Sequence, residues 1–88
     1  MYTVEVKPKA EKFVEAQIPK IQRQLIKRMG DLATDPRPRN CILLHTKEKL
    51  YRIDSGDYRI VYQIQDDKRL VIVAKVRHRK DVYRRLGN

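Results

Sequence analysis

The sequence predicts an α+β domain: a twisted, mainly antiparallel β-sheet packed against two N-terminal helices, with a short C-terminal helix. Three observations lead to this fold class. Helical patterns come early in the chain and strand patterns come late, as in α+β domains. With 88 residues, the chain forms one domain over residues 1–88. Hydrophobic residues make up 41%, enough for one modest core. So small a chain has no room for a deep cavity, so any site should be a shallow surface groove.

The N-terminal third is expected to form a strand and a helical hairpin. Residues 2–7 alternate apolar and polar side chains, which is the period of a half-buried strand. Pro8 suits the first turn of a helix over residues 9–17. Ile18 precedes a proline and therefore avoids the helical region, so a second helix begins at Pro19 and places apolar residues on one face as far as Leu32. Two helices joined in this way form an antiparallel hairpin that packs on a sheet.

The remaining chain is expected to form most of the sheet. Residues 35–40 are rich in proline and form a loop. Strand patterns then cover residues 41–44, 50–53, 58–65 and 68–77, with turns at 54–57 and 66–67. The strand at the N-terminus can run parallel to one neighbour.

Strict alternation along the later strands predicts one face covered by helices and one open face. The open face should carry four basic side chains around an apolar floor. The basic residues are Arg52, Arg59, Lys75 and Arg77, and the floor residues are Val61, Val71 and Val73. An open sheet face that carries arginines is a surface for binding anions.

The charge balance points to a polyanionic partner. The chain has 21 Lys and Arg against 11 Asp and Glu, a net charge of +10. Nucleic acid, an acidic protein or an anionic membrane surface would each match this charge. No apolar segment is long enough to span a bilayer and no signal peptide is visible, so we expect a cytoplasmic protein. The single cysteine, Cys41, excludes an internal disulfide and fits a reducing compartment.

Several enzyme classes are excluded by missing motifs. The sequence has no glycine-rich phosphate loop, no H-E-x-x-H pair and no G-x-S-x-G elbow. One cysteine and two distant histidines do not form a structural zinc site, so we expect neither metal nor cofactor. What remains is a basic cluster. It comprises Lys47, Lys49, Arg52, Arg59, Lys75, Arg77, His78, Arg79, Lys80, Tyr83, Arg84 and Arg85. Arginines bind phosphate oxygens, tyrosines stack on bases, and histidine transfers protons near neutral pH.

Three segments of this cluster resemble the RelE/ParE toxin superfamily, and its RelE branch in particular. They are Tyr51-Arg52-Ile53, then Gly56-Asp57-Tyr58-Arg59-Ile60-Val61-Tyr62, then Val76-Arg77-His78-Arg79-Lys80-Asp81-Val82-Tyr83-Arg84. The resemblance implies the toxin of a type II toxin–antitoxin pair that cuts mRNA in the ribosomal A site. Such an mRNA interferase leaves a 2′,3′-cyclic phosphate and a 5′-hydroxyl.

The resemblance also implies roles for individual residues. Arg59 matches the arginine that binds the scissile phosphate, Arg79 a second arginine that stabilises the transition state, and Tyr83 a tyrosine that stacks on or orients the target nucleotide. Arg52 stands in place of a lysine. Asp54 stands where the best-studied type has a lysine proposed as general base, so the base stays open between His78, Lys47, Lys49 and Asp54. RNA-binding roles are expected for Arg52, Lys47, Lys49, Lys75, Arg77, Lys80 and Arg84.

The expected partners follow from the resemblance and the charge. They are an acidic, partly disordered antitoxin that folds on the toxin, and the ribosome with its mRNA; no membrane partner is expected. Two alternatives belong to other classes: a non-catalytic inhibitor of DNA gyrase, like the ParE branch, and a plain RNA-binding module.

Overall fold

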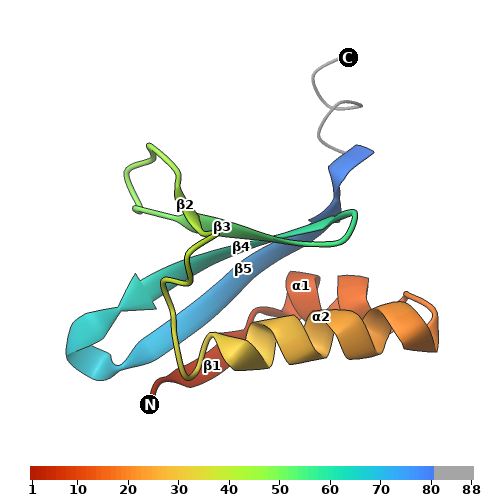
Figure 1. The fold of residues 1–88 in the computed structure, drawn as a ribbon, viewed down its shortest axis with the longest axis horizontal. Helices are drawn as coiled ribbons and strands as arrows, with labels where there is room; N and C mark the ends of the chain where they lie inside the picture. The colour runs from red at the N-terminus through yellow and green to blue at the C-terminus, as the bar shows by residue number, and fades with distance from the viewer. Residues whose placement is uncertain (81–88) are drawn as a thin grey trace.

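A single sheet organises the chain, and a computed structural model describes it for residues 1–80. Within those residues five strands lie in the order β1-β5-β4-β3-β2 (Figure 1). They are β1 (Thr3–Val6), β2 (Ile42–Leu43), β3 (Tyr51–Ser55), β4 (Tyr58–Gln65) and β5 (Leu70–His78). β1 pairs with β5 in parallel and the other pairs are antiparallel, as the sequence predicts. The expected C-terminal helix, with Tyr83 and Arg84, lies outside the described residues.

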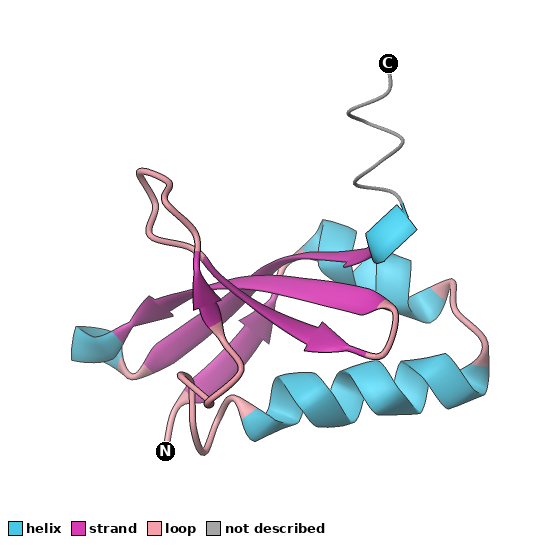
Figure 2. Cartoon of the chain, turned by 45° about the horizontal axis from the view of Figure 1, so that its top comes forward, coloured by secondary structure: helices cyan, strands magenta, loops and turns pink. Residues whose placement is uncertain are grey.

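The two helices begin where the sequence places them. Helix α1 (Pro8–Glu15) and helix α2 (Pro19–Asp31) each have a proline in their first turn, and the preceding Lys7 and Ile18 are extended. Proline favours this position because the missing N–H has no intrahelical partner there. Both helices lie on one side of the sheet, whereas the loop over residues 44–50 rises on the other side (Figures 1 and 2). None of the helices in residues 1–80 is long and apolar enough to span a membrane.

The hydrophobic core fills the layer between the helices and the sheet. Buried side chains come from both helices, from the segment after α2, and from the three central strands. They are Ala10, Val14, Leu25, Met29, Leu32, Ile53, Ile60, Tyr62, Val71, Val73 and Val76. The α+β class is thus confirmed, with one face of the sheet covered and one open.

The predicted floor of the open face is partly wrong, because β5 contains a β-bulge. Val73 pairs with Tyr62, but the next pair along β4 is Val61 with Lys75, so Ala74 is an extra residue. An extra residue shifts the alternation of side chains by one position. Val71 and Val73 are therefore fully buried on the helix side, and the open face presents Ile72 and Ala74 in their place.

Hydrogen bonds connect the proline-rich loop to the end of the sheet away from the β3–β4 turn. The Arg37 guanidinium donates two hydrogen bonds to Asp66, at 3.1 Å to Oδ1 and 2.8 Å to Oδ2, and a third to the Tyr51 hydroxyl at 3.2 Å. The Tyr2 hydroxyl also donates to Asp66 Oδ1, at 2.6 Å. Hydrogen bonds from Arg37 and then Tyr2 lower the pKa of Asp66 to about 2.

A buried tyrosine, Tyr62, also forms a hydrogen bond with the proline-rich loop. The Tyr62 hydroxyl donates to the carbonyl oxygen of Pro36 at 2.7 Å, and burial raises the pKa of this tyrosine. The loop therefore closes the core at the end of the sheet away from the β3–β4 turn.

Candidate functional site

Two arginines and one carboxylate lie together on the open face, near the β3–β4 turn. Arg59 on β4 pairs with Asp54 on β3, and Arg52 lies two residues before Asp54, so all three side chains share a face. One carboxylate oxygen, Asp54 Oδ1, lies 3.8 Å from the Nε atoms of both Arg52 and Arg59. The arginine side chains are 23% and 27% exposed, against 55% for Asp54.

Both guanidinium groups keep free donors. Neither Arg52 nor Arg59 donates a hydrogen bond to any group in residues 1–80. The Nε atom of Arg52 is moreover buried without a partner in this part of the chain. Buried N–H groups are nearly always paired, so this donor marks a place where an anion oxygen would be stabilised.

Arg79 is held by the turn between β3 and β4. Its backbone N–H donates to the carbonyl oxygen of Asp57 at 2.8 Å, and its Nε lies 3.7 Å from Asp57 Oδ1. The Arg79 side chain remains 60% exposed. Arg77 pairs with Arg59 in the β4–β5 ladder, so Arg79 follows directly at the strand end nearest Arg59.

His78 lies on the side of the helices. It pairs with Tyr58, and the two rings meet edge to face at 5.1 Å. Tyr58 in turn packs against Phe13 of α1 and donates from its hydroxyl to Gln17 Oε1 at 3.2 Å. Because opposite residues in a ladder point to the same face, His78 and Arg59 are not brought together by the sheet.

A hydrogen bond also occupies one nitrogen of His78. Its Nδ1 accepts from the backbone N–H of Lys80 at 3.1 Å. In a neutral imidazole the accepting nitrogen carries no proton, so Nε2 is then the protonated nitrogen. In this arrangement His78 presents a donor rather than a free proton acceptor.

Three of the remaining predicted RNA-binding residues, on or just after β5, lie in different places. Lys75 lies on the open face, opposite Val61. Arg77 leans toward α1: its guanidinium carbon is 5.9 Å from the centre of the Phe13 ring, and its Nη1 donates to the carbonyl oxygen of Val76 at 3.0 Å. Lys80 is exposed beyond the end of β5. Tyr83 and Arg84 lie outside the described residues.

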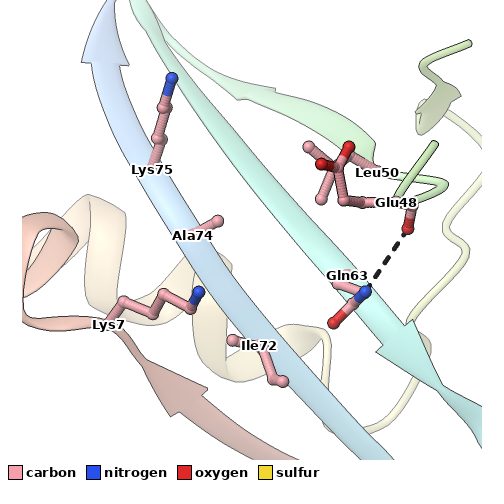
Figure 3. Close-up of a pocket in the computed structure, with 7 residues that line it drawn as sticks. All are labelled: Lys7, Glu48, Leu50, Gln63, Ile72, Ala74 and Lys75. Atoms are coloured by element: carbon pink, nitrogen blue, oxygen red, sulfur yellow. Dashed lines mark hydrogen bonds between the residues drawn. The ribbon is translucent and has the colours of Figure 1, made fainter. Parts of the chain in front are cut away.

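Lys47 and Lys49 belong to the loop that rises beside the open face. The loop is closed by backbone hydrogen bonds from Leu44 N to Leu50 O at 2.7 Å and from Lys49 N to Thr46 O at 3.1 Å. Lys49 adopts the left-handed conformation, with φ of 52°. The Gln63 amide donates to the carbonyl oxygen of Glu48 at 3.4 Å, which ties the loop to the sheet (Figure 3).

A groove of about 320 Å³ lies between this loop and β5, which fits the expectation of a shallow site. Ile72 and Ala74 form its floor, and the amino groups of Lys7 and Lys75 lie on the β5 side (Figure 3). Glu48, Leu50 and Gln63 complete the lining. Sequence reasoning missed Lys7 and Gln63, because the groove depends on the loop over residues 44–50 lying against the sheet, and no local pattern predicts that packing.

The arrangement can bind a negatively charged chain. Arg52, Arg59 and the lysines of the groove line one continuous open face, with Arg79 at its end. Among residues 1–80, no three His, Cys, Asp or Glu side chains are placed to hold one metal ion. Fixed cations on a rigid sheet can stabilise charge that develops on a phosphate.

Comparisons with a protein family, with a curated relative and with solved structures all point to toxins of toxin–antitoxin systems. Residues 4–83 match a family described as the ParE toxin of the type II toxin–antitoxin system parDE. Toxin RelG of Mycobacterium tuberculosis is 29% identical over 85 residues, which cover 96% of this chain and 98% of RelG. A chain of the archaeal RelE–RelB complex from Pyrococcus horikoshii superposes with a TM-score of 0.79 at 25% identity, covering 89% of this chain and 94% of that chain. The RelBE toxin–antitoxin complex of E. coli gives a TM-score of 0.73 at 28% identity, over 86% and 94% respectively.

Proposed function

Since the chain belongs to the ParE toxin family of type II toxin–antitoxin systems and is a RelE-like toxin, we propose that it is a ribosome-dependent mRNA endonuclease. It would act in the cytoplasm, on mRNA in the ribosomal A site, without a metal ion. The observation that carries the proposal is the pair Arg52 and Arg59, half-buried on an open sheet face, with donors that no group in residues 1–80 uses.

The proposed reaction needs charge stabilisation and proton transfer. The 2′-oxygen of the RNA attacks the adjacent phosphorus, the bond to the 5′-oxygen breaks, and a 2′,3′-cyclic phosphate forms. One proton leaves the 2′-hydroxyl and one is added to the departing 5′-oxygen. Arg59, with Arg52 beside it and Arg79 at the strand end, would stabilise the extra negative charge on the phosphoryl oxygens. Each such contact is worth about 2–4 kcal/mol of transition-state stabilisation.

The positions of the side chains support the roles of the arginines more directly than they support any one proton-transfer group. Asp54 lies beside Arg59, whereas His78 lies with Tyr58 on the helix side and presents a donor. With Nδ1 occupied, neutral His78 offers the leaving oxygen only a hydrogen bond from Nε2–H. Transfer of a proton from His78 requires the imidazolium, whose Nδ1–H cannot accept from Lys80. Lys47 and Lys49, on the neighbouring loop, remain candidates for the base. Tyr83 is proposed to stack on the target nucleotide.

The partner is proposed to be an acidic antitoxin. The net charge of +10 favours a negatively charged polypeptide, and the solved complexes from P. horikoshii and E. coli each contain a RelB partner. An antitoxin that covers Arg59 and Arg79 would block the mRNA phosphate directly. A copurified complex should therefore fail to inhibit translation.

A second function is favoured by one observation: the matching family is described by its ParE member. A ParE-like toxin would inhibit DNA gyrase without catalysis. Expression of the chain in cells separates the two functions. A nuclease should give transcripts cut within codons, with 5′-hydroxyl ends, and no DNA-damage response. DNA-damage signalling with intact transcripts would support the gyrase inhibitor instead.

The arginine site is tested in the same experiment with a matched pair of variants. Arg59→Ala should remove toxicity and cleavage. Arg39→Ala changes an exposed arginine in the loop between α2 and β2, outside the proposed site, and should leave both unchanged. His78→Gln keeps a side-chain acceptor for Lys80, so a large fall in its cleavage rate would support proton transfer by His78.

A further inference from the structure

Asp54 has an unexpected position for a site that binds phosphate. Its carboxylate lies between the two arginines that are proposed to receive the scissile phosphate, with one oxygen 3.8 Å from each Nε. Arg52 and Arg59 come from neighbouring strands and point to the same face, where like charges repel. A carboxylate at this point offsets one of the two positive charges and reduces the repulsion between the arginines when no RNA is bound.

The carboxylate partly neutralises these arginines without satisfying their hydrogen-bonding capacity. A separation of 3.8 Å exceeds the length of an N–H···O hydrogen bond. The Nε of Arg52 accordingly has no hydrogen-bond partner among the described residues. A phosphate offers several oxygens, which can approach both guanidinium groups at hydrogen-bonding distance. The donors therefore fit a phosphate better than they fit Asp54.

Asp54 is also held in a way that allows exchange. Its backbone carbonyl accepts from Arg28 Nε at 3.3 Å, which anchors the main chain to α2. Within residues 1–80 its carboxylate accepts no hydrogen bond and forms ion pairs only with the two arginines, and the side chain is 55% exposed. The side chain can therefore rotate toward solvent while the strand stays in place.

We propose that Asp54 is an internal counter-ion that occupies the phosphate-binding side of Arg52 and Arg59 in the free toxin and gives way to an RNA phosphate. The inference rests on the proposed function and assigns Asp54 a role in affinity rather than in proton transfer. This role and that of a catalytic base predict different effects when Asp54 is replaced. Removal of the charge should strengthen RNA binding and leave the rate of the chemical step nearly unchanged.

The test measures binding of a short single-stranded RNA with 2′-O-methyl groups, which cannot be cleaved, at low ionic strength. Asp54→Asn should bind about five- to tenfold more tightly than wild type, the effect of removing one negative charge near a phosphate at a solvent-exposed site. Asp67→Asn makes the same change of charge at an exposed position in the β4–β5 turn and should alter affinity less than about twofold. Asp54→Glu keeps the charge and should stay close to wild type.

The outcomes separate the two levels of the proposal. If Arg59→Ala does not weaken binding, the proposed phosphate site is wrong. If Arg59→Ala weakens binding but Asp54→Asn does not strengthen it, only the counter-ion role is overturned. A fall of about 100-fold in single-turnover cleavage by Asp54→Asn, at saturating ribosomes, would overturn it as well, because that is the signature of a base. Asp54→Ser provides the same comparison if the asparagine variant does not fold.

Discussion

The bulge at Ala74 allows a sharp test of the β5 register through two single-residue deletions. Deletion of Ala74 removes the residue that has no partner, so Val73 remains opposite Tyr62 and Lys75 remains opposite Val61. Deletion of Ile72 instead breaks the alternation between two core residues. Either Val71 or Val73, both fully buried, must then turn to the open face.

The two deletions should differ clearly in stability. Exposing one fully buried valine costs about 1.5–3 kcal/mol. A domain of this length has a free energy of unfolding of roughly 4–13 kcal/mol, so the Ile72 deletion should lower the urea midpoint strongly or prevent folding. The Ala74 deletion loses no core side chain and should cost less than about 1.5 kcal/mol. Urea unfolding followed by circular dichroism measures both; equal damage by the two deletions would refute the assigned register.

Three further predictions concern stability. Asp66→Asn should lower the free energy of unfolding at pH 7. Because the pKa of Asp66 is lowered in the folded protein, its stabilisation is lost on protonation, and the difference from wild type should shrink as the pH falls from about 4 toward 2. A constant difference in acid unfolding curves would contradict this. Tyr62→Phe should cost about 1–2 kcal/mol in chemical unfolding because it leaves a buried carbonyl without its donor, so an unchanged midpoint would count against that hydrogen bond. Gly56→Ala should destabilise the protein by about 1 kcal/mol, because φ is +59° there. Gly30→Ala should stabilise it by a similar amount, because alanine favours the interior of a helix such as α2 more than glycine does. Shifts of equal sign in thermal unfolding would show the backbone argument to be wrong.

Much of the fold could be predicted because local patterns determine it. The two prolines mark the helix starts, alternation marks β1 and β4, and the late position of the strands gives the α+β class. The bulge could not be predicted, since one extra alanine in an apolar strand leaves no signal in the sequence. Its effect reached the site: it moved Val71 and Val73 into the core and placed Ile72 and Ala74 in the groove.

The parts of the site that follow from side-chain alternation within adjacent strands could be predicted. The parts that depend on pairing between distant segments could not. Arg52 and Arg59 lie on one face because two strands joined by a short turn must keep their alternation across it. The position of His78 depends on which residue of β4 it opposes, and that register follows from the bulge. The Arg37–Asp66 pair joins segments 29 residues apart, for which no spacing rule exists.

The proposed nuclease activity is tested most directly by single-turnover cleavage of mRNA on ribosomes with wild type, Arg59→Ala and Arg39→Ala. If the arginine pair stabilises the reacting phosphate, Arg59→Ala should fold normally and cut about 100-fold more slowly or worse, while Arg39→Ala should cut at the wild-type rate. A folded Arg59→Ala variant that cuts as fast as wild type would contradict the proposed site, and the likeness to RelE toxins would then extend to the fold but not to the mechanism.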